Sequence, residues 1–154
     1  MTQLTEHFTL EEAQITNHRT IDNTAPMVII PVLMKTATGM ERVRACLEDK
    51  AITVSSWYRC PPLNTAVGSG PTSQHPKGEA VDFICPAYGS PLKIVRKLAE
   101  NKILLRFDQL ILEHTWVHIS FNSNPDGKQR GQVLTLLNGG KYAQGITDKN
   151  GVPV

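Results

Sequence analysis

Ser73-Gln-His75-Pro-Lys-Gly78-Glu-Ala80-Val-Asp82 joins a turn-rich loop to a strand. Residues 79–85 predict the strand, because apolar and β-branched side chains follow the Pro, Gly and Ser of the loop. Alternate residues of a strand share a face, so Asp82 lies on one defined side of the sheet. Gly78 allows a sharp turn of the backbone just before the strand. This geometry can bring His75 back over Asp82.

A second short motif, Trp116-Val-His118, lies in a predicted strand that continues to Phe121. Strand alternation places His118 on the same side as Trp116 and Ser120. The alternate residues of this strand are apolar and predict the side that meets the core. His118 therefore lies on the polar side, where a cleft is expected.

His75, Asp82 and His118 together provide two imidazoles and one carboxylate. Three such ligands with an open fourth position are typical of a catalytic zinc site, in which the metal acidifies a water molecule. A structural zinc ion more often has four protein ligands, usually including cysteines. Each histidine alone is more often an ordinary polar residue, so the combination carries the prediction. His7 and His18 match no motif.

The strands at 109–113 and 116–121 predict a hairpin with His114-Thr115 as its two-residue turn. Glu113 then pairs directly with Trp116, and directly paired residues lie on one face. A carboxylate beside the metal could accept a proton from water and pass it to a leaving amine. His114 is the alternative base or an extra ligand, or simply an exposed turn histidine.

The string S-x-H-x-x-G-x-A-x-D with a later W-x-H resembles the zinc peptidases of the D-alanyl-D-alanine carboxypeptidase (M15) family. These enzymes cut the peptide part of bacterial cell walls. The resemblance runs from about Phe8 to about Leu137 and is closest to the short branch common in phages and prophages. Further matches are Trp57-Tyr-Arg59-Cys-Pro-Pro-Leu-Asn64, Phe107-Asp-Gln-Leu-Ile-Leu-Glu113 and Arg130-Gly-Gln-Val-Leu.

The resemblance implies a role for several residues around the metal ligands. The family places an arginine at the position of Arg59, where a guanidinium can bind a carboxylate or support an oxyanion. Its general base is an acid shortly before the last histidine, which implies Glu113; many relatives have that acid where this chain has Thr115. Ser73 would fix the loop or support a ligand. The remaining candidates for substrate binding or support are Asn64, Trp116 and Arg130.

Composition and charge narrow the class of protein. The 154 residues are 40% hydrophobic and 19% charged, which indicates one globular domain. The net charge of only +2 gives no case for a nucleic-acid partner. Three cysteines at irregular spacing are not a disulfide framework. The first residues lack a signal-peptide pattern, and no stretch predicts a membrane span. We therefore expect synthesis in the cytoplasm, with a holin, another export route or a virion bringing the protein to the wall.

The expected fold is a single α+β domain over residues 1–154, with its core at about 8–137 and a loosely ordered tail at 139–154. As the resemblance implies, an antiparallel sheet of about four to five strands carries the zinc site on one face and helices on the other. Strands are predicted at 52–58, 79–85, 109–113, 116–121 and 132–137. Helices are predicted after the capping box Thr9-Leu-Glu-Glu12, over about 27–48, and from Ser90-Pro91 to about Asn101.

The leading hypothesis is a zinc peptidase, with one zinc ion per chain, that hydrolyses peptidoglycan as a phage or prophage wall hydrolase. The bond could be D-Ala-D-Ala, L-Ala-D-Glu or a cross-bridge, and a monomer is favoured. One alternative is a non-catalytic zinc module of the wall or virion, similar to the amino-terminal domain of hedgehog proteins. Another is a dipeptidase for small D-Ala-D-Ala-type peptides.

Overall fold

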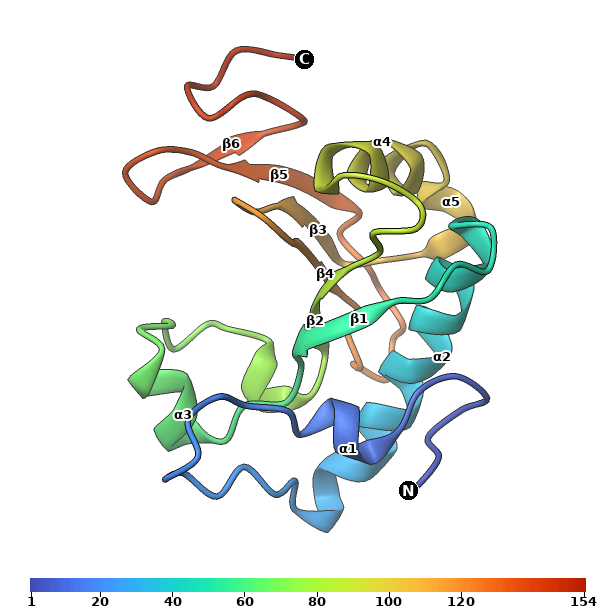
Figure 1. Cartoon of the computed structure of the whole chain (residues 1–154), viewed down its shortest axis with the longest axis vertical. Coiled ribbons are helices and arrows are strands. Elements are labelled where there is room, and N and C mark those ends of the chain that lie inside the picture. The colour runs from blue at the N-terminus through green and yellow to red at the C-terminus, as the bar shows by residue number, and fades with distance from the viewer.

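A six-stranded sheet forms the centre of the protein, with strand order β1-β2-β4-β3-β5-β6. The computed structural model describes all 154 residues. The chain is α+β, as predicted, and Figure 1 shows the sheet running through the middle of the molecule. The strands are β1 (Thr53–Ser56), β2 (Ala80–Ile84), β3 (Gln109–Leu112), β4 (Val117–Ser120), β5 (Gln132–Leu136) and β6 (Tyr142–Gln144).

The register of the central strands fixes the polar side of the sheet. In the antiparallel pairing of β2 with β4, Asp82 lies opposite His118. On the other side of β4, Ile111 of β3 lies opposite the same histidine. The N–H of Glu113 donates to the carbonyl of Trp116 at 3.1 Å, which confirms the predicted two-residue hairpin turn.

The sheet is larger than expected, and it is mixed rather than antiparallel. β5 runs parallel to β3, with Gln132 opposite Gln109. The connection 121–131 is short, so β5 has to begin at the edge where β4 ends. Beyond it, β6 pairs antiparallel with β5 in the segment that the sequence suggested was a loose tail. The glycines at 139 and 140 have positive φ and form the turn of this last hairpin.

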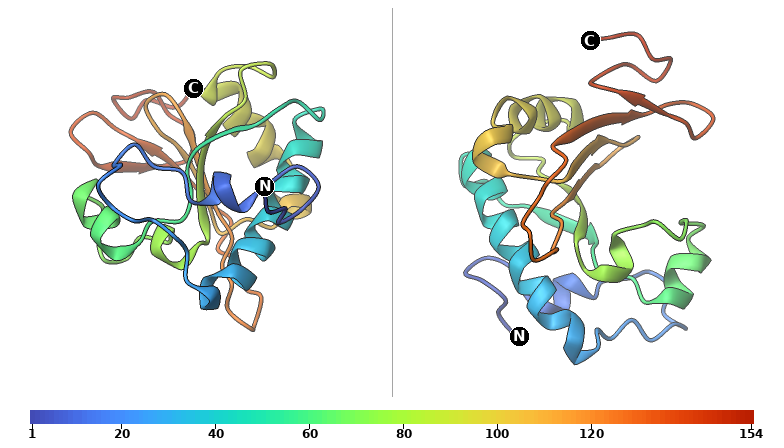
Figure 2. Two further views of the ribbon diagram at one scale, coloured as in Figure 1. Left: turned by 60° about the horizontal axis from the view of Figure 1, so that its bottom comes forward. Right: turned by 180° about the vertical axis from the view of Figure 1, so that it is seen from behind.

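Helices cover one side of the sheet. Figures 1 and 2 show α2, α4 and α5 together on that side, while α3 and the loop leading to η2 project from the other. Thr9 and Glu12 form the predicted capping box, Pro31 lies in the first turn of α2, and Ser90 caps α4. The helices are α1 (Leu10–Ala13), η1 (Met27–Ile29), α2 (Ile30–Cys46), α3 (Pro61–Ala66), η2 (His75–Lys77), α4 (Pro91–Glu100) and α5 (Lys102–Leu105).

The core lies between the helices and the apolar side of the sheet. Val117 and Ile119 of β4 are fully buried in it, as the alternation of that strand predicts. The intervening His118 therefore points to the opposite side. The three cysteines are free, and none of the helices has the length and apolar character needed to cross a membrane. The largest fully buried side chains include Trp57, Phe8, Phe83, Phe107, Leu33 and Met40.

Candidate metal centre

The structure brings His75, Asp82 and His118 together at the polar side of β2 and β4. One potential ligand atom from each lies within 4.8 Å of the others, so the cluster could hold a metal ion. His75 Nε2 is 3.3 Å from Asp82 Oδ2, and His118 Nδ1 is 2.8 Å from Asp82 Oδ1. Tetrahedral ligands at about 2 Å from a zinc ion lie roughly 3.3 Å apart, which matches the first distance, whereas the second is that of a hydrogen bond.

The backbone before β2 sets the position of His75. Gly78 has a φ of 78°, and a Cβ there would lie 2.9 Å from Leu33 Cδ2, so the turn requires glycine. Its carbonyl accepts hydrogen bonds from Trp57 Nε1 at 3.0 Å and from Thr36 Oγ1 at 2.8 Å. These contacts fix the turn against β1 and α2, and with it the imidazole of His75.

A backbone carbonyl determines the tautomer of His75. His75 Nδ1 is 2.6 Å from the carbonyl oxygen of Trp57, and a carbonyl can only accept. Nδ1 therefore carries the proton, and in the neutral ring the lone pair of Nε2 faces Asp82 Oδ2. A hydrogen bond to the second nitrogen is the usual way in which a metal-binding histidine is oriented.

The pair of His75 Nε2 and Asp82 Oδ2 requires a positive charge. Without a proton or a metal ion between them, two lone pairs would face each other at 3.3 Å. Burial, the largest influence on His75, lowers the pKa of its imidazole and disfavours the proton. Burial alone would raise the pKa of Asp82, but the neighbouring imidazoles outweigh it and hold that pKa well below its usual range. The donor set therefore fits a divalent metal.

Arg59 lies directly behind the carboxylate ligand. Its Nη2 donates to Asp82 Oδ2 at 3.0 Å and its Nε donates to Ser56 Oγ at 3.0 Å. Burial lowers the pKa of this guanidinium, while the charges of Asp82 and Glu113 act in the opposite direction. Arg59 also lines the cleft over the cluster.

Glu113 lies at the end of β3 and lines the same cleft as the three potential ligands. Burial raises the pKa of its carboxyl group; among the smaller effects, the charge of Asp82 raises it further, whereas His118 and Arg59 lower it. A carboxyl group with a raised pKa exchanges protons nearer to neutral pH. His114, the alternative, is exposed in the turn and does not line the cleft.

The cleft has a volume of about 700 Å³. The loop 67–75 forms one side of it, the loop wall, and the strands with the β3–β4 turn form the other, the sheet wall. The loop wall contains Ser73, whose Oγ accepts the N–H of His75 at 3.2 Å. The sheet wall contains Trp116, whose indole N–H has no hydrogen-bond partner. Leu134 of β5 and Tyr142 of β6 also line the cleft.

Two of the predicted substrate-binding residues lie outside the cleft. Asn64 is buried in α3 and donates to the carbonyl of Gly70 at 3.3 Å, so it holds the loop wall from behind. Arg130 instead forms an ion pair with Asp108 at 2.7 Å and lines a neighbouring polar pocket that shares Thr72 and Gln74 with the cleft. Its motif position indicated a contact with substrate, but the buried carboxylate of Asp108 holds its guanidinium.

Sequence reasoning missed several contributors to the site. The carbonyl of Trp57 has no signature in the sequence, because every residue has one. The side chain of Gln74 links Glu79 Oε2 and Asp108 Oδ2, at 3.0 and 3.1 Å, and so ties the loop of His75 to β3. The aromatic residue in the short strand β6 could have indicated Tyr142, but only a predicted sixth strand would have placed it in the cleft.

The model of the protein family described as Peptidase M15 matches residues 6–120 of the 154 in this chain. No curated protein matches the chain in sequence. The matched segment contains the three potential ligands, Arg59 and Glu113. Leu134 and Tyr142, which complete the sheet wall of the cleft, lie beyond it.

Proposed function

Because the chain belongs to the M15 family of zinc-dependent peptidases, we propose that it hydrolyses peptide bonds in bacterial peptidoglycan. One observation carries this proposal: a cluster of two histidines and an aspartate opens into a cleft that also contains Glu113. A wall hydrolase encoded by a phage or prophage, expected from the resemblance, is part of the same proposal.

His75, Asp82 and His118 would hold the metal. A zinc ion bound there would supply Lewis acidity toward the scissile carbonyl and lower the pKa of a water molecule. Trp57 fixes the tautomer of His75 through its carbonyl, and Arg59 orients the carboxylate of Asp82. Both contacts hold the ligands in place before any substrate enters.

Glu113 would move the proton. Its carboxylate accepts a proton from water in the cleft and donates it to the nitrogen of the leaving amine. The raised pKa of this group favours the first transfer, because a stronger base takes the proton from water more readily. The guanidinium of Arg59 adds positive charge beside the site where the oxygen of the tetrahedral intermediate becomes negative.

The test is mass spectrometry of purified peptidoglycan after incubation with the zinc-loaded protein. A chelated sample and the Glu113→Gln variant are the matched controls. We expect new peptide fragments from the parent protein and none from either control, and the fragment masses identify the bond. Equal cleavage by a folded, zinc-loaded Glu113→Gln variant would contradict the role of Glu113.

The other outcomes select between the two alternatives. Cleavage of free D-Ala-D-Ala-type peptides without cleavage of intact wall would indicate a dipeptidase. Zinc-dependent retention on the wall with no new amino termini would indicate a non-catalytic module.

A further inference from the structure

A hollow of about 410 Å³ lies on the helical side of the protein, between α2, the end of α5 and the loop 121–131. Three cationic side chains line it: Lys35, Arg42 and Arg106. The side-chain amides of Asn122 and Gln129 also line it, and no carboxylate does. This basic hollow shares no lining residue with the metal cleft.

Close packing builds the hollow and holds Arg42 in it. Gly39 allows the ring of Phe121 to lie against α2, because a Cβ at Gly39 would be 2.7 Å from that ring. One turn further along the helix, the guanidinium of Arg42 lies 5.7 Å from the centre of the same ring. Arg42 Nη2 donates to the carbonyl of Leu105 at 3.3 Å. The arginine is therefore anchored before any ligand arrives.

The cations of the hollow have no acidic partner. None of the seven ion pairs in the protein includes Lys35, Arg42 or Arg106. The Nε of Arg42 is buried and has no hydrogen-bond partner. Burial, and then the positive charge of Arg106, lower the pKa of Arg42, so the two guanidinium groups repel each other. An anion between them would relieve this repulsion.

The backbone of Arg106 makes it useful as a probe. It ends α5 in the left-handed region, with a φ of 53°, where glycine is the usual residue. The conformation itself therefore gives no reason for an arginine at this position. Replacement of Arg106 by glycine would remove the charge and suit the backbone.

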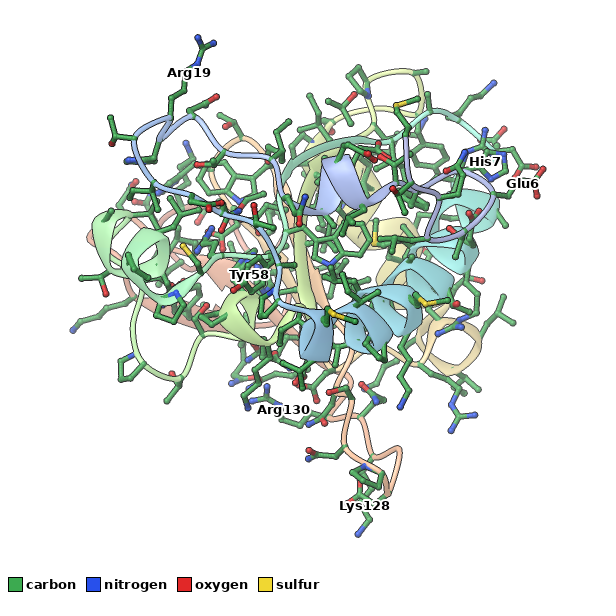
Figure 3. The ribbon with its side chains drawn as sticks, turned by 90° about the horizontal axis from the view of Figure 1, so that it is seen from below. Glu6, His7, Arg19, Tyr58, Lys128 and Arg130 are labelled. Carbon is green, nitrogen blue, oxygen red and sulfur yellow. The ribbon has the colours of Figure 1, made fainter.

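A second hollow, of about 520 Å³, continues from the first through Arg106, Gly127 and Gln129. It adds the side chains of Lys102 and Lys128 and that of Arg130, which is already paired with Asp108, and Asp126 is the only acid that lines it. Figure 3 shows Lys128 toward the outer end of the loop and Arg130 nearer the body of the protein. The cations thus extend over two adjoining hollows, which suits a ligand with several anionic groups along a chain.

We propose that the basic hollow and its neighbour bind the phosphodiester groups of an anionic polymer, with one phosphate on Arg42 and Arg106. Guanidinium groups suit phosphate because their planar donors can bind two oxygens at once. The assignment to a phosphodiester polymer of the bacterial wall rests on the proposed function, whereas the phosphate site itself does not. Binding there would hold the protein on the wall while the separate metal cleft acts on peptide.

The first experiment measures binding of inorganic phosphate to the zinc-loaded protein by calorimetry, at constant ionic strength. We compare the parent with Arg106→Gly and with Lys149→Gln, an exposed cation outside both hollows that gives the same change in net charge. The Kd should rise about tenfold or more in Arg106→Gly, as for the loss of one charge-assisted contact. The melting temperature should stay the same or rise, and Lys149→Gln should bind like the parent.

Three results would overturn the phosphate site. They are unchanged binding in Arg106→Gly, an equal loss in Lys149→Gln, or binding that disappears entirely when the zinc is chelated. The last result would place the phosphate in the metal cleft instead.

The second experiment tests whether the protein binds the polymer. It measures the fraction of protein retained on sedimented cell wall, before and after the phosphodiester polymers of the wall are removed. Removal should reduce retention of the parent to the level of Arg106→Gly, while hydrolysis of isolated stem peptides stays unchanged. Retention that does not depend on the polymer would overturn the assignment to a phosphodiester polymer of the wall. Tighter binding to an oligonucleotide than to the wall would overturn it as well. A protein that binds phosphate and intact wall but cleaves nothing would contradict only the proposed function.

Discussion

Asp82 and Asp108 are both buried aspartates paired with an arginine, yet their surroundings differ. Asp82 contacts Arg59, and its other neighbours are the imidazoles of His75 and His118 at the floor of the cleft. Asp108 receives four hydrogen bonds from Arg130, one of them from its backbone, and one from Gln74. Burial alone would raise the pKa of Asp108, but the hydrogen bonds from Arg130 outweigh it and lower that pKa.

The difference separates a carboxylate available for chemistry from one that supports the fold. Both oxygens of Asp108 are occupied by amide and guanidinium donors, which cannot be exchanged for a metal. Each oxygen of Asp82 faces an imidazole nitrogen that can itself bind a metal ion, and only Oδ2 also accepts from a guanidinium, that of Arg59. The presence of an Asp–Arg pair therefore says little about function until the remaining partners of the carboxylate are known.

The largest effect is expected for Asp82→Asn. The amide keeps the size of the side chain and removes the charge that would hold the metal, so the zinc content should fall from one ion per chain to near zero. Hydrolysis should drop by more than about 10³-fold, beyond the loss of a single stabilising donor. Elemental analysis and peptide-release assays measure both, with circular dichroism as the control for folding. A variant that retains zinc and activity would remove Asp82 from the metal site.

The same substitution at Asp108 should lower the stability of the protein and leave its zinc content unchanged. Asp108→Asn leaves Arg130 without its buried partner and should lower the free energy of unfolding by about 2–3 kcal/mol. Zinc content per folded molecule should not change. Urea denaturation and elemental analysis give the two readouts, and loss of zinc at unchanged stability would show that the two aspartates are not distinct in role.

Removal of Arg130 should have a smaller effect that depends on pH. The side chain of Arg130 is 55% exposed, so Arg130→Gln should cost about 1–2 kcal/mol at pH 7. The native pKa of Asp108 is lowered, so this contribution is present above about pH 4, the unfolded value, and is lost as pH falls below it. Urea denaturation at several pH values should show the parent and variant converging in acid.

Arg19→Gln is the control for the loss of charge in that experiment. Arg19 projects from a loop far from Arg130 in Figure 3 and forms no ion pair. A gap between the parent and Arg130→Gln that widens in acid would show that Arg130 does not stabilise ionised Asp108.

The smallest effect is expected on the loop that carries His75. Ser73→Ala removes the acceptor for the N–H of His75, but the contact of Nδ1 with Trp57 remains. Activity should fall by about 10-fold or less, the low end for groups that support a metal ligand. Steady-state kinetics with saturating zinc would measure it. A loss as large as that of Asp82→Asn would mean that Ser73 takes a direct part in catalysis.

Local patterns in the sequence predicted most of the fold. The capping box at Thr9, the cap at Ser90 and the alternation around His118 are all present in the structure. Each of these signals depends on residues a few positions apart. The parallel pairing of β5 with β3 and the sixth strand depend on how distant segments meet, which no short pattern reports.

The three potential metal ligands could be predicted from the sequence, but the contacts of the residues around them could not. The full string from Ser73 to Asp82 with the later Trp116-Val-His118 was needed to expect the cluster, and strand alternation then fixed the side on which Asp82 and His118 lie. The positions of Asn64 and Arg130 could not be predicted, since their orientation depends on partners distant in sequence, such as Asp108. The family motif indicated that these residues matter but not what they contact.

The last two strands have a consequence for how such a protein can diversify. Every member of the metal cluster precedes residue 120, whereas Leu134 and Tyr142 follow it and reach the cleft only because β5 pairs with β3. Substitutions in the segment 132–144 can therefore change the shape of the cleft without altering the three potential ligands. Under the proposed function, selectivity and chemistry would then depend on different stretches of one small domain.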